Sequence, residues 1–195
     1  LSSFKIHDDV DTIASYAFFR CESLSDFRIP PKVTNIPNSL FSGCSSLSTI
    51  EVYDNIFSIE SRAFFSCKSL QNFTVPSKIT IIPEYVFYRC TSLSLFKIHN
   101  NVEHIGSYSF YMCQSLQNFT IPPKITNISD QLFAECKNLS RIEIHDNVEY
   151  IGYAAFFRCQ SFKNFTIPPK VTAIADILLR DCEILSSVEI HDNIT

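Results

Sequence analysis

Cysteine and histidine are the residues of this chain best suited to bind a metal, form disulfides or carry out catalysis, and both recur at fixed spacing. Eight cysteines follow one another at intervals of 23 residues without an insertion: Cys21, Cys44, Cys67, Cys90, Cys113, Cys136, Cys159 and Cys182. Four histidines share one position of the same repeat, with Tyr53 in the missing place: His7, His99, His145 and His191. Thiolate and imidazole are preferred zinc ligands, and both also serve in nucleophilic catalysis. Whether they can converge depends on how the repeat folds.

A constant period of 23 residues predicts a solenoid, in which each repeat forms one coil and contacts only its neighbours. Phe119 and Ile121 alternate as in a strand with one buried face, whereas Phe110, Cys113 and Leu116 are spaced by three, which predicts a short helix or 3₁₀ turn. The same apolar positions recur in every coil. We therefore expect an α/β solenoid of 23-residue coils, with a parallel sheet on one face and short helical or 3₁₀ turns on the other. It should span residues 1–195 as one domain of about eight and a half repeats, with a strand in each from residues 4–6 to 188–190.

This arrangement argues against chemistry at the cysteines and histidines. Neighbouring histidines of the shared position lie two coils apart, about 9–10 Å at the spacing of parallel strands, which is too far to share a zinc ion. Stacked cysteines have parallel Cα–Cβ bonds, so their Cβ atoms stay too far apart for a disulfide. We expect eight buried, unpaired thiols, with no metal, no cofactor and no enzymatic activity.

Composition excludes two further classes of protein. The net charge of −4 and the lack of a basic run argue against a nucleic-acid partner. No run of 18 apolar residues is present, so we expect no insertion into a membrane. The sequence starts in the middle of a repeat, without an initiator Met or a visible signal peptide, and we interpret it as a fragment of a longer protein.

Two different sequences alternate along the chain at the end of the predicted strand in successive coils. NFTIPPK occurs at residues 118–124 and 164–170, with NFTVPSK at 72–78 and FRIPPK at 27–32, always 46 residues apart. We call the coils with these endings odd coils; the even coils between them carry IHDN or a relative instead. Proline ends a strand because it cannot donate to a ladder, and Asp and Asn favour turns. The genetic unit is therefore a pair of coils.

Three odd coils also carry a glycosylation sequon, at Asn72, Asn118 and Asn164. Other sequons begin at Asn127, Asn138 and Asn193. One interpretation is a coat of N-glycans on a secreted protein; the other is that duplication copied one short triplet without selection for sugar.

Segments such as IGSYSFYMCQSLQNFTIPPKITNI (105–128) and IGYAAFFRCQSFKNFTIPPKVTAI (151–174) resemble the BspA-like leucine-rich repeat family. The resemblance extends over the whole chain, with small departures such as Leu179 in place of Phe. It implies the leucine-rich repeat fold. It also implies a relation to bacterial and protist surface proteins that attach to host cells and matrix.

From this resemblance we expect a non-enzymatic, protein-binding domain at the cell surface or secreted, whose partner is a host cell-surface or matrix protein. A cytoplasmic scaffold or regulatory interaction domain is the alternative, because fold does not determine function. The charged and aromatic residues of the even coils are the candidate partner-binding sheet face: Glu51, Tyr53, Lys97, His99, Glu143, His145, Glu189 and His191. Open ends of the solenoid also predict end-to-end self-association.

Overall fold

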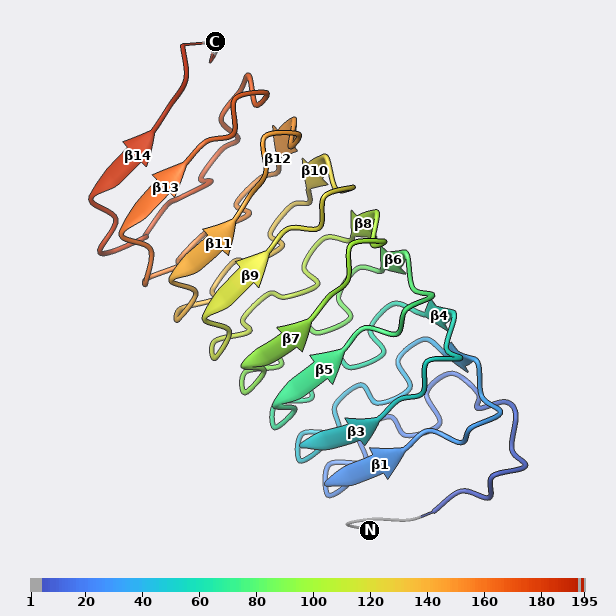
Figure 1. The fold of residues 1–195 in the computed structure, drawn as a ribbon. Coiled ribbons are helices and arrows are strands. Elements are labelled where there is room, and N and C mark those ends of the chain that lie inside the picture. Colours follow the sequence, from blue (N-terminus) through green and yellow to red (C-terminus); the bar gives the residue numbers. More distant parts are fainter. Residues whose placement is uncertain (1–4, 193, 195) are drawn as a thin grey trace.

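Eight short parallel strands, one from each coil, form one face of the solenoid, which we call the strand face (Figure 1). The computed structural model describes residues 5–192 and 194. The strands are β1 (Asp26–Arg28), β3 (Thr49–Glu51), β5 (Asn72–Thr74), β7 (Leu95–Lys97), β9 (Asn118–Thr120), β11 (Arg141–Glu143), β13 (Asn164–Thr166) and β14 (Ser187–Glu189). From β1 to β13 the middle residue of each strand-face strand is buried or half-buried and faces the core, as predicted, whereas the middle residue of β14, Val188, is 37% exposed. The strand predicted at residues 4–6 lies partly outside the described residues, and Lys5 and Ile6 are not in a strand.

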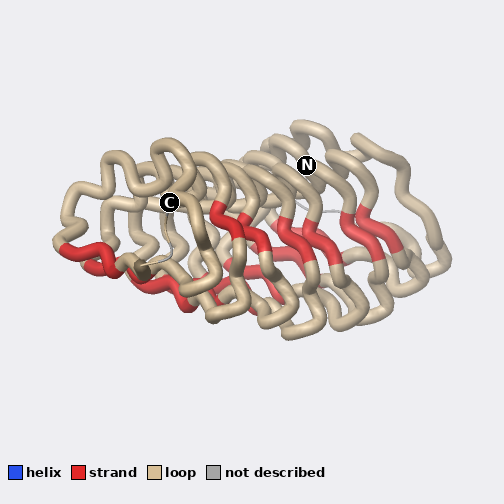
Figure 2. Tube along the Cα trace, turned by 90° about the horizontal axis from the view of Figure 1, so that it is seen from above, coloured by secondary structure: helices blue, strands red, loops and turns tan. Residues whose placement is uncertain are grey.

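A second row of two-residue strands runs along the solenoid, which the sequence analysis did not predict (Figure 2). They are β2 (Asn35–Ile36), β4 (Ser58–Ile59), β6 (Ile81–Ile82), β8 (His104–Ile105), β10 (Asn127–Ile128) and β12 (Tyr150–Ile151). Each ends on the isoleucine that recurs fifteen residues after Cys, and this side chain is buried. Each of the six coils that contain β1, β3, β5, β7, β9 and β11 therefore presents two strand segments.

The strands pair in twos. On the strand face β1 pairs with β3, β5 with β7, β9 with β11, and β13 with β14; in the second row β2 pairs with β4, β6 with β8, and β10 with β12. Every ladder joins an odd coil to the even coil that follows, for example Phe119 opposite Ile142. Between residues 26 and 189, all of which are described, no ladder joins an even strand to the next odd strand. The 46-residue genetic unit is thus also the hydrogen-bonded unit of both strand rows.

The predicted helical or 3₁₀ turns are wrong: the described residues contain no helix, and consecutive β-turns take their place. The physical reason is that the residues one and five before each Cys have positive φ, such as Tyr108 (60°) and Met112 (59°). A left-handed residue at every fourth position prevents a helix from propagating. Two kinds of backbone hydrogen bond alternate along this segment. Some residues donate their N–H to a carbonyl three residues earlier in the same coil, as Tyr111 does to Tyr108 (3.2 Å), and the residues between them donate to the next coil, as Phe110 does to Leu132 (3.1 Å). We call this the turn side.

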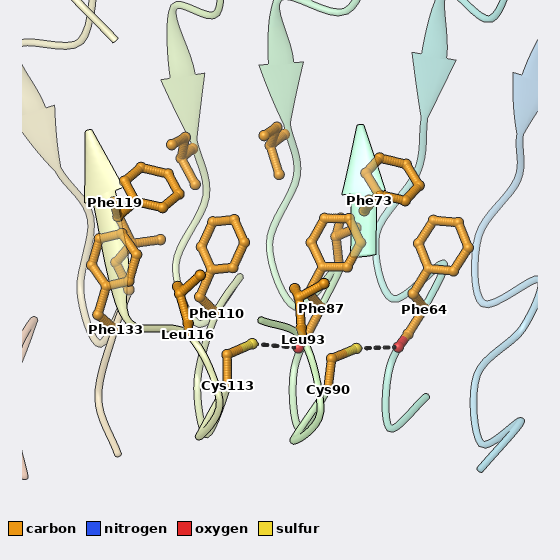
Figure 3. Packing of buried hydrophobic residues seen from close by; sticks show 14 of the residues in the cluster. Phe64, Phe73, Phe87, Cys90, Leu93, Phe110, Cys113, Leu116, Phe119 and Phe133 are labelled. Carbon is orange, nitrogen blue, oxygen red and sulfur yellow. Dashed lines mark hydrogen bonds between the residues drawn. The ribbon is translucent and has the colours of Figure 1, made fainter. Parts of the chain in front are cut away.

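Stacked rings and thiols fill the core. Phe110 lies 5.7 Å from Phe87 and 5.5 Å from Phe133 between ring centroids, with nearly parallel planes (Figure 3). The thiol of Cys113 donates to the Phe87 carbonyl at 3.3 Å, and the same bond recurs at every cysteine from Cys44 to Cys182. The repeated Phe and Cys positions therefore bind each coil to the one before it. The buried assignment of both positions is confirmed, apart from the exposed Cys21 and the partly buried Phe18, Leu179 and Cys182 at the ends.

Candidate binding face

Grooves open on the strand face where the ladders are missing. They lie between β3 and β5, β7 and β9, and β11 and β13, with volumes of about 240, 380 and 410 Å³. A further hollow of about 270 Å³ lies over the β1–β3 pair. In each of the three grooves the floor combines a buried Phe of the odd strand with a half-buried apolar residue of the even strand: Ile50, Phe96 or Ile142. The three grooves thus lie at equivalent places, one pair of coils apart, between strands that no ladder joins.

The structure places four of the candidate residues on the outward side of even strands, where they are exposed: Glu51, Lys97, Glu143 and Glu189. The first three line the three grooves. Two of the carboxylates are also used within a pair of coils. Glu143 accepts hydrogen bonds from Thr120 Oγ1 at 2.9 Å and from Arg141 at 2.7 Å, and Glu189 accepts one from Thr166 Oγ1 at 3.0 Å.

Two candidate histidines have a structural role that the sequence did not reveal. His145 Nε2 lies 3.0 Å from the Pro122 carbonyl oxygen, and its Nδ1 accepts the Asn147 N–H at 3.3 Å. His99 repeats this arrangement with Pro76 at 2.9 Å and Asn101 at 3.3 Å. Because Nδ1 accepts, Nε2 must carry the proton that it donates to the proline carbonyl. Both rings are half-buried and tie the even coil to the turn of the preceding odd coil.

The other two candidates at this position, Tyr53 and His191, differ from these histidines. Tyr53 is half-buried, and its hydroxyl accepts a hydrogen bond from Arg28 at 3.0 Å. His191 is exposed near the C-terminal end. The eight candidates therefore divide into exposed strand residues, half-buried residues that join two coils, and one exposed ring.

Turns after the strands bridge the gaps that the ladders leave. Asp54 accepts hydrogen bonds from the backbone N–H of Ser77 at 2.6 Å and from its hydroxyl at 2.7 Å, and these bonds lower the pKa of the Asp54 carboxyl. Lys124 forms an ion pair with Glu103 at 2.7 Å across the next gap, and Lys170 donates to the Asn147 side chain at 3.0 Å across the third. A polar contact thus joins the two coils on either side of each groove.

The sequon asparagines line the same three grooves. Asn72, Asn118 and Asn164 are the first residues of β5, β9 and β13, and all three are exposed. Asn127 and Asn138 are exposed elsewhere, and Asn193 lies outside the described residues. A glycan on Asn118 would therefore rise from the wall opposite Lys97. The candidate binding residues and the candidate glycosylation sites share one surface.

The cysteines and histidines do not assemble into a reactive centre. Among residues 5–192 and 194, no group of three or more His, Cys, Asp or Glu side chains is arranged to hold a metal. All eight cysteines are free thiols. Burial raises the pKa of Cys44 to about 12, and burial also raises the pKa of Cys67 and Cys113 well above the ordinary value. A thiol held protonated is a poor nucleophile and a poor metal ligand.

Comparisons with known proteins agree with this architecture. The sequence matches the family described as BspA type Leucine rich repeat region, in 6 copies, over residues 1–101 and 80–195. The crystal structure of the T. pallidum leucine-rich repeat protein TpLRR is similar at a TM-score of 0.71 and 32% identity, covering 77% of this chain and 70% of that one. A leucine rich cell surface protein from Faecalibacterium prausnitzii is similar in fold, with a TM-score of 0.62 and 24% identity, covering 90% of this chain and 62% of that one. The curated proteins contain no match. No helix among the described residues could span a bilayer.

Proposed function

Because the chain belongs to the BspA-type leucine-rich repeat family, we propose that it is a recognition domain of a surface protein and attaches to a host cell-surface or matrix protein through the strand face. Leucine-rich repeats of this kind are typically non-catalytic interaction modules. The name of the Faecalibacterium relative supports the surface location.

The observation that carries the proposal is the regular series of three grooves on the strand face. Each has an apolar floor and a charged residue of an even strand on its rim: Glu51, Lys97 or Glu143. Apolar recesses surrounded by polar rims are typical of protein interfaces. A rigid scaffold also loses little conformational entropy on binding, because its contact residues are already ordered.

The test reverses together the four exposed charges among the candidate residues: Glu51→Lys, Lys97→Glu, Glu143→Lys and Glu189→Lys. The matched control makes the same net change away from the strands, at exposed positions: Glu22→Lys, Lys68→Glu, Glu84→Lys and Glu183→Lys. Binding of each purified protein to cultured host cells and to immobilised matrix would be measured together with its melting temperature.

We expect the strand-face variant to lose binding by about tenfold or more while the control binds like the parent, because reversed rim charges repel a complementary partner. Equal binding by the two variants would assign recognition to another surface. The same cell and matrix binding assay, repeated with enzymatically glycosylated protein, tests the sequons. A glycan on Asn118 or Asn164 should weaken binding, because it would obstruct a partner that enters the groove that this residue lines.

A further inference from the structure

The groove between β7 and β9 differs from its two counterparts in the first residue of its even strand. Leu95 is 53% exposed. The corresponding first residue is polar in all the other strands of the strand face: Asp26, Thr49, Asn72, Asn118, Arg141, Asn164 and Ser187. An apolar side chain that stays in water at a position otherwise kept polar contributes nothing to the core. It can contribute to an interface, where its burial is favourable.

The charge in this groove is also distinctive. Lys97 is exposed on the same wall, and none of the residues that line the groove is acidic. No ion pair or side-chain hydrogen bond joins Lys97 to another residue between 5 and 192. In the β11/β13 groove, by contrast, Glu143 is paired with Arg141 at 2.7 Å. The β7/β9 groove therefore presents an uncompensated positive charge beside an exposed apolar side chain.

Leu95 and Lys97 lie two residues apart on one strand, so both project from the same side, about 7 Å apart along it. Between them the half-buried Phe96 forms the floor, and Asn118 stands on the opposite wall. A partner that matches this wall needs an apolar and an acidic side chain at the same separation. Alternate residues of an extended chain have this spacing.

We infer that the β7/β9 groove binds an extended segment of a protein partner by placing an apolar side chain against Leu95 and Phe96 and a carboxylate against Lys97. This inference rests on the proposed function and names the kind of partner that the strand face accepts. The other two grooves then serve as flanking surface, because their rims are acidic or internally paired.

The probe is a set of synthetic twelve-residue peptides that differ at one pair of alternate positions: Val-x-Glu, Val-x-Lys and Ser-x-Glu. Binding of labelled peptides to the 195-residue protein is followed by fluorescence anisotropy. The variants Leu95→Asn and Lys97→Thr introduce residues that other coils carry at the same positions, so both should fold. Lys97→Glu reverses the charge. Phe57→Thr is the matched control, since Phe57 is 60% exposed directly before β4 and Thr occupies the same repeat position at Thr34 and Thr80.

We expect the parent to prefer Val-x-Glu and to lose about tenfold or more of this affinity in Leu95→Asn and Lys97→Thr, with Phe57→Thr unchanged. Lys97→Glu should bind Val-x-Lys instead. Equal binding of the three peptides by the parent, or equal binding by all variants, would overturn the inference. Loss of cell or matrix binding in the four-charge variant but not in Leu95→Asn or Lys97→Thr would also overturn it and leave the proposed function standing. Charge-selective peptide binding without cell or matrix binding would support the groove and refute the attachment function.

Discussion

On the turn side every coil is hydrogen-bonded to the next, whereas on the strand face ladders join coils only in twos. Tyr108, Phe110 and Met112 donate their N–H groups to the following coil, and equivalent residues do so from Tyr16 to Arg158. The β9 strand, in contrast, pairs with β11 and leaves a gap toward β7. The same 23-residue coil therefore forms a continuous support on one side and a segmented surface on the other.

This difference separates the residues that hold the solenoid together from those available for binding. The Phe stack and the thiol-to-carbonyl bonds run through the core without interruption, while grooves appear where the strand ladders stop. In a solenoid, each coil is stabilised by its neighbours, so damage to the continuous part should weaken all coils nearby. Damage to the segmented part should remain local. The two sides can be tested separately.

The largest effect is expected from a break in the core stack. Phe110 is fully buried between the rings of Phe87 and Phe133, and Phe110→Ala should lower the free energy of unfolding by about 3–5 kcal/mol through lost burial and the cavity left behind. Urea denaturation measures this change. The control is Tyr111→Ala, which removes a ring stacked on Tyr88 at the half-buried outer side and should cost about 1 kcal/mol. Similar losses for both variants would contradict the distinction between core and surface rings.

A smaller effect is expected where a side chain joins the two coils of one pair. His145→Ala removes the bonds to the Pro122 carbonyl and from the Asn147 N–H, and should destabilise the protein by about 1–2 kcal/mol. Hydrogen exchange at the Asn147 amide should accelerate, while amides of the turn side keep their protection. His104→Ala is the control, because His104 is exposed in β8. Loss of protection throughout the molecule would show that the pairs are not local units.

The constant period predicted the solenoid, its parallel strands and its core, because each buried position recurs in every coil. The turn side was not predictable from residue types. Its positive-φ positions hold Arg, Tyr, Met, Glu and Ile as well as Gly43, so no left-handed propensity marks them. Bonds to the next coil impose this backbone conformation after stacking. Likewise, the sequence showed alternating coil endings, but not that Phe96 and Phe119, whose ring centroids lie 6.0 Å apart, would form the floor of an open groove. The groove between β7 and β9 depends on which backbone N–H and carbonyl groups form hydrogen bonds when the coils stack.

The smallest effect concerns the thiols, and it should be invisible at neutral pH. Burial raises the pKa of Cys44 from 9.0 to about 12 and that of Cys182 to about 11, so the unfolded chain ionises these thiols at lower pH than the folded protein does. Their contribution to stability is fully present below pH 9 and is lost as pH rises from 9 toward 11–12. Urea denaturation of the parent and of Cys44→Ala at pH 7, 9 and 10 should therefore show that the free energy of unfolding falls less steeply with rising pH in the variant.

A labelling experiment tests the burial of the same row of thiols. At pH 8, iodoacetamide should label the exposed Cys21 of the folded protein and leave the fully buried Cys113 unmodified. Rapid native labelling of Cys113, or cysteines linked 23 residues apart in mass spectra of the unreduced protein, would show that the thiols do not form the buried row of carbonyl-bonded groups.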